Sequence, residues 1–300
     1  MKYLNGKLTK SRLIVSDQID TLNIYDLADD EIVFVKEIKF GFGKDEYFRT
    51  FEFIENENLL LIGKKNGVIQ FIDLTTERVI REIKLPLSND YYLDWNLDIL
   101  KLSNDERWLV VGQTWYTAYP VNLKTFESIE VSIPAQPLKI QYSFDNKYVS
   151  IIHGEQGGQG LVIYSQSEKG EWKEIYEHWA ITGFEFSLDE NIIYHFGLKD
   201  EVGVLKKVNL SNAVRTEWEA FFSLKELGDE NIHNYGFGLH SLVNQGKGLE
   251  FSINNMTFVL SALTGKVILT KTNDYKIVDV LSNGQLRVIL TGEKMIVEKM

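Results

Sequence analysis

The chain of 300 residues contains no cysteine and only four prolines. The absence of cysteine excludes disulfides, thiolate nucleophiles and zinc or iron–sulfur sites that are held by cysteine. Because no proline-rich or serine-rich linker divides the sequence, we expect a single domain spanning residues 1–300.

Positive charge is also in deficit, since the chain has 32 Lys and Arg residues but 43 Asp and Glu residues, which gives a net charge of -11. A protein that binds nucleic acid or an anionic membrane surface needs cations that neutralise phosphate groups. The composition therefore argues against both of these partners. A charged protein partner is expected to be basic.

Long apolar runs are missing as well. Runs such as Leu59–Ile62 end far short of the roughly 20 residues that a membrane-spanning helix requires. No apolar stretch behind Met1 has the length of a secretory signal. We therefore expect no membrane segment and a cytoplasmic location.

The chain does contain repeated β-rich runs, which are clearest in residues 47–85. Four runs follow one another there, at 48–54, 59–62, 68–74 and 78–85. Asn66 and Gly67 separate the second run from the third, and this dipeptide is typical of a two-residue hairpin turn because both residues tolerate positive φ. The pattern predicts four short antiparallel strands in about 40 residues.

The same order recurs along the whole sequence. A turn with Ser and an acidic or amide residue follows the first run of several units, at 103–106, 143–146, 187–190 and, in a weaker copy, 282–284. Such side chains accept hydrogen bonds from nearby backbone N–H groups. The predicted units are 1–41, 47–85, 92–134, 137–178, 180–224, 232–271 and 276–300. The last unit has only three runs, and we expect Met1–Leu4 to supply its fourth strand and so close a ring.

These features resemble the WD-repeat and related β-propeller superfamily over essentially the whole chain. The resemblance rests on the Ser-x-Asp turns and on Tyr25-Asp26 and Ile72-Asp73, which stand where the family has its Trp-Asp dipeptide. The family's Gly-His pair is missing, and no Trp occupies the dipeptide position. The resemblance implies an all-β fold, a β-propeller of seven four-stranded antiparallel blades, with six blades as the alternative number.

Residues that could carry catalysis do not form a recognisable motif. The five histidines are spread over three units without the spacing of metal ligands, and no Gly-x-Ser-x-Gly motif occurs. Gly154–Gly160 lacks the Lys-Ser/Thr pair of a phosphate-binding loop, so we interpret it as a flexible hairpin loop. Most paired carboxylates fall in turns, where they are solvated. We therefore predict no catalytic residue, no metal and no cofactor.

Aromatic residues are divided between a predicted core and a predicted binding face. The core set is Phe51, Phe53, Trp108, Phe184 and Phe186. In the resembled family, the connection that enters each blade and the connection between its second and third strands open on one face. Aromatic residues in those connections give the predicted partner-binding set: Tyr47, Tyr91, Tyr92, Trp95, Trp115, Tyr116, Trp179, His233, Tyr235 and Tyr275. Tyr and Trp are frequent at binding hot spots.

The function predicted from these features is a non-enzymatic scaffold that binds a basic protein and is monomeric on its own. A specific version is an immunity-type inhibitor that covers the basic active site of a toxin. One alternative is a hydrolase or lactonase acting on a sugar-like ligand in the central channel, which would require closely opposed Asp, Glu and His side chains there. Another is a structural subunit of a larger assembly, which would require apolar patches on the outer strands of the blades.

Overall fold

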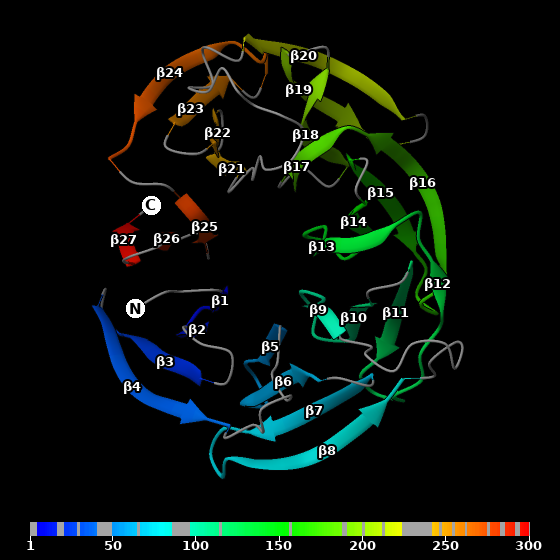
Figure 1. The fold of residues 1–300 in the computed structure, drawn as a ribbon, viewed down its shortest axis with the longest axis vertical. Helices are drawn as coiled ribbons and strands as arrows, with labels where there is room; N and C mark the ends of the chain where they lie inside the picture. Colours follow the sequence, from blue (N-terminus) through cyan, green and yellow to red (C-terminus); the bar gives the residue numbers. More distant parts are fainter. Residues whose placement is uncertain are drawn as a thin grey trace. The chain divides into compact units, whose positions relative to one another are not determined.

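A computed structural model describes residues 5–299 except 17–20, 29–30, 41–49, 65–66, 86–96, 114–115, 156–157, 188–190, 200–201, 212–213, 224–241, 246–247, 254–255, 262, 275–276, 283–285 and 292–294. In this part of the chain all regular structure is β-strand, β1 to β27 (Figure 1). The chain forms two compact units. Unit 1 contains residues 1–140 and 281–300, and unit 2 contains residues 141–280.

The strands form seven antiparallel sheets in chain order. The first sheet is β1 (Asn5–Leu8), β2 (Arg12–Ser16), β3 (Thr21–Ala28) and β4 (Glu31–Lys39). The second is β5 (Thr50–Ile54), β6 (Leu59–Gly63), β7 (Val68–Asp73) and β8 (Arg78–Lys84). The third is β9 (Leu97–Leu102), β10 (Trp108–Gln113), β11 (Thr117–Asn122) and β12 (Val131–Ser132). The fourth is β13 (Gln136–Tyr142), β14 (Tyr148–Glu155), β15 (Gly158–Gln166) and β16 (Trp172–Trp179).

The remaining sheets continue the pattern. The fifth is β17 (Ile181–Phe186), β18 (Ile192–Lys199), β19 (Val202–Asn209) and β20 (Arg215–Ser223). The sixth is β21 (Leu242–Gln245), β22 (Gly248–Ile253), β23 (Met256–Ser261) and β24 (Val267–Thr272). The seventh has three described strands, β25 (Ile277–Ser282), β26 (Leu286–Thr291) and β27 (Met295–Lys299). Six four-stranded sheets and a shorter last one confirm the predicted all-β repeat. Met1–Leu4, the predicted closing strand, lies outside the described residues.

The Ser-x-Asp turns determine where the first strand of a sheet ends and the second begins. Ser103 donates a hydrogen bond from Oγ to Asp105 Oδ1 at 2.7 Å and accepts one from the Trp108 backbone N–H at 3.0 Å. The same bonds recur at Ser143, Asp145 and Tyr148, at 2.6 and 2.9 Å. Because the contacts are local, a short sequence motif is sufficient to place this turn in two consecutive sheets.

A polar residue at the end of the third strand has a similar role. Asp73 Oδ1 accepts hydrogen bonds from the backbone N–H groups of Thr75 at 2.6 Å and Thr76 at 3.2 Å, which starts the turn into β8. These two bonds are the largest causes that lower the pKa of Asp73. Asn122 accepts the equivalent bonds at the end of β11. Of the two residues at the family's Trp-Asp position, Asp73 therefore caps a turn, whereas Asp26 lies within β3 and accepts a hydrogen bond from Arg12 Nε at 3.1 Å.

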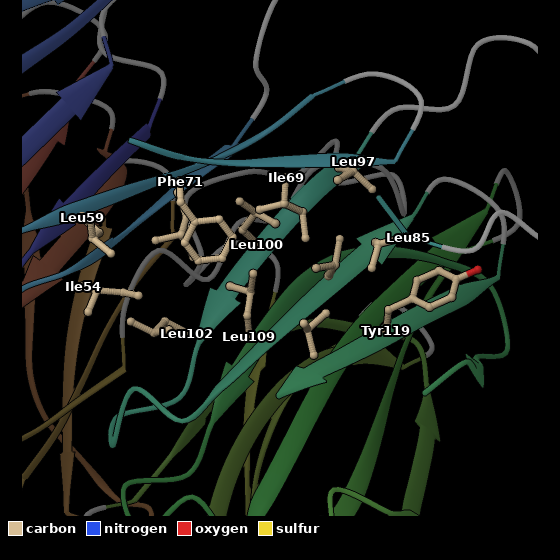
Figure 2. Close-up of a cluster of buried hydrophobic side chains, with 13 residues drawn as sticks. Ile54, Leu59, Ile69, Phe71, Leu85, Leu97, Leu100, Leu102, Leu109 and Tyr119 are labelled. Atoms are coloured by element: carbon tan, nitrogen blue, oxygen red, sulfur yellow. The ribbon is translucent and has the colours of Figure 1, made fainter. Parts of the chain in front are cut away.

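Apolar side chains between neighbouring sheets form the core. Figure 2 shows the cluster between the second and third sheets, in which Phe71 of the second sheet lies near Leu100 of the third. A smaller cluster joins the two ends of the chain within unit 1, because Leu13 and Val15 of β2 pack with Val288 of β26. The first and last sheets are therefore in contact through side chains.

Four of the five predicted core aromatics are buried as expected, namely Phe51, Phe53, Trp108 and Phe184. Phe186 is half-buried and packs at the edge of the cluster, with its ring 5.0 Å from that of Phe184.

The interpretation of Gly154–Gly160 as a hairpin is confirmed, but most of this segment is strand and not flexible loop. β14 continues through Glu155 and β15 begins at Gly158, so most of the segment belongs to a regular hairpin. The glycines are needed for local geometry. Gly158 has a φ of 142°, which side chains disfavour. Gly160 leaves space between two rings on its neighbouring strands.

Candidate interaction site

Most of the predicted partner-binding residues lie outside the described part of the chain: Tyr47, Tyr91, Tyr92, Trp95, Trp115, His233, Tyr235 and Tyr275. The structure describes Tyr116 and Trp179. Both side chains are exposed, with exposed fractions of 40% and 50%.

Strand register shows where the connections of the third sheet begin and end. Leu97, the first residue of β9, pairs with Gln113, the last residue of β10, which in turn pairs with Thr117 of β11. The chain therefore enters β9 and passes from β10 to β11 at one end of the sheet. In sequence, five predicted binding residues stand in these two connections: Tyr91, Tyr92, Trp95, Trp115 and Tyr116.

Tyr116 occupies the hairpin between β10 and β11 with a φ of 56°. This left-handed conformation is uncommon for a bulky residue. It is stabilised by a hydrogen bond in which the backbone N–H of Ile133 donates to the carbonyl oxygen of Tyr116 at 2.8 Å. Gln113 beside this hairpin is fully buried, and its amide atoms have no hydrogen-bond partner among the described residues.

Trp179 is the last residue of β16 and not, as its predicted position implied, part of the connection to the next sheet. It pairs with Gly160 of β15, which pairs with His153 of β14. The rings of His153 and Trp179 meet edge to face, with centroids 4.9 Å apart and an interplanar angle of 85°. An exposed indole is therefore held against a buried imidazole.

Gly160 allows this contact because it has no side chain between the two rings. A Cβ atom at residue 160 would lie 2.5 Å from His153 Cε1 and 3.3 Å from Trp179 Cε3. His153 is fully buried, and neither of its ring nitrogens has a hydrogen-bond partner in the described part of the chain. Burial lowers the pKa of His153, while the charge of Glu177 opposes the shift. The imidazole is therefore neutral at neutral pH.

A second cluster of titratable residues joins the fourth and fifth sheets within unit 2. The rings of His178 on β16 and His195 on β18 lie 4.9 Å apart, and the Tyr176 hydroxyl shares a hydrogen bond of 2.9 Å with His195 Nε2. The neighbouring strands add an ion pair of 3.0 Å between Lys206 and Glu219. Sequence spacing did not indicate this cluster, because it depends on how two sheets pack.

Burial dominates the electrostatics of this cluster. It lowers the pKa of His195 to about 3, and the nearby charges of His178 and Lys206 act in the same direction. Burial also lowers the pKa of His178 and raises the pKa of Tyr176 to about 12. Both imidazoles are therefore neutral near pH 7.

Charged residues also connect the first strands of unit 1, where β5 lies between β1 and β9. Lys7 Nζ lies 2.5 Å from Glu52 Oε2, and Lys101 Nζ lies 3.8 Å from Glu52 Oε1. The Glu52 carboxylate is buried. Its Oε2 atom forms an ion pair with Lys7, but the geometry of this contact is not that of a hydrogen bond. Two lysines therefore neutralise the one carboxylate in this group.

The fourth strands of several sheets expose apolar side chains. These strands stand at the edges of their sheets. The exposed residues include Val33, Phe34 and Val35 on β4, Val79 and Ile80 on β8, and Val267, Ile268 and Leu269 on β24. Such patches are the observation expected for a subunit of a larger assembly.

Within the described residues, no group of three or more His, Asp or Glu side chains is arranged to hold a metal ion. The same part of the chain contains no helix that is long and apolar enough to cross a membrane.

Comparison with known proteins identifies the fold. The chain is similar over its full length to the β-propeller domain of Cps50 (Swd1) from Myceliophteria thermophila, with 11% identity, 96% of that chain covered and a TM-score of 0.65. It is also similar, over 96% of its length and at 10% identity, to a chain in a crystal structure of the mitotic checkpoint complex, of which 84% is covered with a TM-score of 0.68. No family model and no curated protein sequence matches the chain.

These similarities, together with the seven sheets, show that the protein has a β-propeller fold. The predicted fold is therefore confirmed, and each sheet is a blade. Identities this low show the fold alone, so the function must be argued from the chain's own residues.

Proposed function

We propose that the protein is a partner-binding β-propeller whose ligand is a basic protein, held at the end of β16 that carries Trp179. The observation that supports this proposal best is the exposed indole of Trp179, which packs edge to face against the buried His153 in the space left by Gly160. An exposed Trp with its ring packed in this way loses less conformational entropy on binding than an unpacked side chain, which suits a hot-spot residue. The net charge of -11 favours a basic partner.

The enzymatic alternative requires paired carboxylates, as glycoside hydrolysis does. In the first strands of unit 1, the contacts described for the Glu52 carboxylate are ion pairs with Lys7 and Lys101, which do not form such a pair. Immunity-type inhibition of a toxin is a specific form of the proposed function, and it rests on the acidity of the chain alone.

The proposal is tested by comparing proteins retained from a native lysate by the wild type, by Trp179→Ala and by Phe144→Ala. Phe144 is a matched control, because it is an aromatic residue with an exposed fraction of 70% in the turn at the opposite end of the same blade. We expect a basic protein that is retained by the wild type and by Phe144→Ala and lost with Trp179→Ala. Equal retention of the basic protein by all three would contradict the proposal.

A second candidate, a subunit of a larger assembly, is favoured by the apolar edge strand β24, where Ile268 is 65% exposed. Its test is the mass of the native complex measured by light scattering. A complex that is lost with Ile268→Lys and kept with Trp179→Ala would favour this candidate over the first.

A further inference from the structure

The outer strand of the fourth blade carries an acidic residue beside Trp179 on the same face. Glu177 and Trp179 are two residues apart on β16, and the register with β15 is regular over this stretch, with Val162 opposite Glu177 and Gly160 opposite Trp179. Alternate residues of a strand project to the same side, about 7 Å apart. The carboxylate and the indole therefore form adjacent parts of one surface.

Both side chains are accessible and lack polar partners. Glu177 is exposed, and it makes no ion pair or hydrogen bond with any described residue. Its charge opposes the lowering of the His153 pKa that burial causes. An unpaired carboxylate next to an exposed aromatic face is the combination that attracts an organic cation.

The buried layer beneath the indole is neutral and rigid. His153 meets Trp179 edge to face at 4.9 Å and remains uncharged near pH 7, so it adds no positive charge that would repel a cation. Gly160 lets the rings approach, as a Cβ atom there would overlap His153. The orientation of the indole is therefore set before any ligand arrives.

We propose that Glu177 and Trp179 form a binding site for a guanidinium or alkylammonium group, and that His153 is a positioning residue for the indole. The indole provides its π face, the carboxylate provides the opposite charge, and the planar guanidinium of an Arg side chain fits both. The inference rests on the proposed function only in naming the partner's chemistry, which is an exposed Arg or Lys side chain.

The site is tested on the full chain with N-acetyl-arginine amide as the probe and N-acetyl-citrulline amide as its neutral isostere. The indole N–H resonance of Trp179, assigned by its loss in Trp179→Leu, is followed during titration up to about 100 mM, because one exposed cation–π contact contributes only a few-fold in affinity. We expect a saturable shift with the arginine probe and none with citrulline. Equal shifts with both probes, or no saturable shift with arginine, would overturn the proposal.

The role of the carboxylate is tested by a matched pair of variants. Glu177→Gln should weaken arginine binding about threefold. Glu171→Gln also removes one negative charge, but Glu171 precedes the first residue of β16, at the other end of the strand from Trp179, and this variant should not change the affinity. Equal affinities for Glu177→Gln and the wild type would contradict the role assigned to Glu177.

The role of His153 is tested by replacement with Ala and with Phe. His153→Ala should weaken arginine binding at least threefold, while His153→Phe, which retains a ring against the indole, should restore most of the affinity. Equal weakening in two folded variants would contradict positioning by the ring. If neither variant folds, the surface variants of Glu177 and Trp179 still decide the proposal.

The two proposals can fail independently. Failure to bind the arginine probe, combined with Trp179-dependent retention of a basic protein, would reject the cation site and leave the proposed function intact. Binding of the probe without any Trp179-dependent protein partner would reject the proposed function and leave the cation site intact.

Discussion

The buried histidine between the fourth and fifth blades predicts that the protein loses stability under mildly acidic conditions. The pKa of His195 is lowered from 6.5 to about 3, mainly by burial. Between these values the unfolded chain binds a proton that the folded chain does not, so stability decreases as the pH falls below 6.5. For this shift, the free energy of unfolding decreases by about 2 kcal/mol between pH 7 and pH 5. The pKa values of His153 and His178 are lowered as well, which adds to the loss.

The assay is urea-induced unfolding at pH 7 and pH 5 for the wild type and His195→Gln. Gln cannot titrate in this range and retains a polar group for the Tyr176 hydroxyl, which lies 2.9 Å from His195 Nε2. The variant should show a pH-dependent loss that is smaller than the wild-type loss by about 2 kcal/mol. Phe144→Ala, a change remote from this cluster, should retain the full wild-type dependence. Identical pH dependence in His195→Gln and the wild type would refute the reasoning.

Three further substitutions test other parts of the structure. Gly160→Ala should destabilise the protein by about 1–3 kcal/mol and alter the Trp fluorescence, since the added Cβ would lie 2.5 Å from His153; an unchanged urea midpoint would contradict the described packing. Ser143→Ala should cost about 1–2 kcal/mol in urea unfolding, because the Tyr148 N–H loses its acceptor; a neutral effect would show that the turn does not depend on this bond. Glu52→Gln should cost about 1–3 kcal/mol in thermal unfolding, since Lys7 and Lys101 lose their shared carboxylate; a stabilised variant would contradict the ion-pair assignment.

The fold could be predicted because the repeated turns are formed by hydrogen bonds between residues that are close in sequence. The hydrogen bonds around Ser103 and Ser143 span five residues or fewer, so the same short motif produces the same turn wherever it occurs. The strand pattern between these turns follows from the alternation of apolar and polar residues.

The groups of interacting side chains could not be predicted, because they depend on contacts between residues that are far apart in sequence. Glu52 meets Lys7 and Lys101 from separate blades, and His178 meets His195 only when two blades pack. The glycine-rich sequence around Gly160 is typical of a loop, but Gly160 lies within β15. There its missing side chain leaves room for the rings of His153 and Trp179. The aromatic composition indicated Trp179 but could not indicate that His153 supports it.

In the proposed function, a basic partner binds around Trp179 at the end of β16 and not at the exposed apolar strands β4, β8 and β24. Hydrogen–deuterium exchange of the chain, alone and in complex with the partner it retains, measures this most directly. We expect protection at the end of β16 around Trp179. Protection confined to the exposed apolar strands β4, β8 and β24, with no change around Trp179, would contradict it.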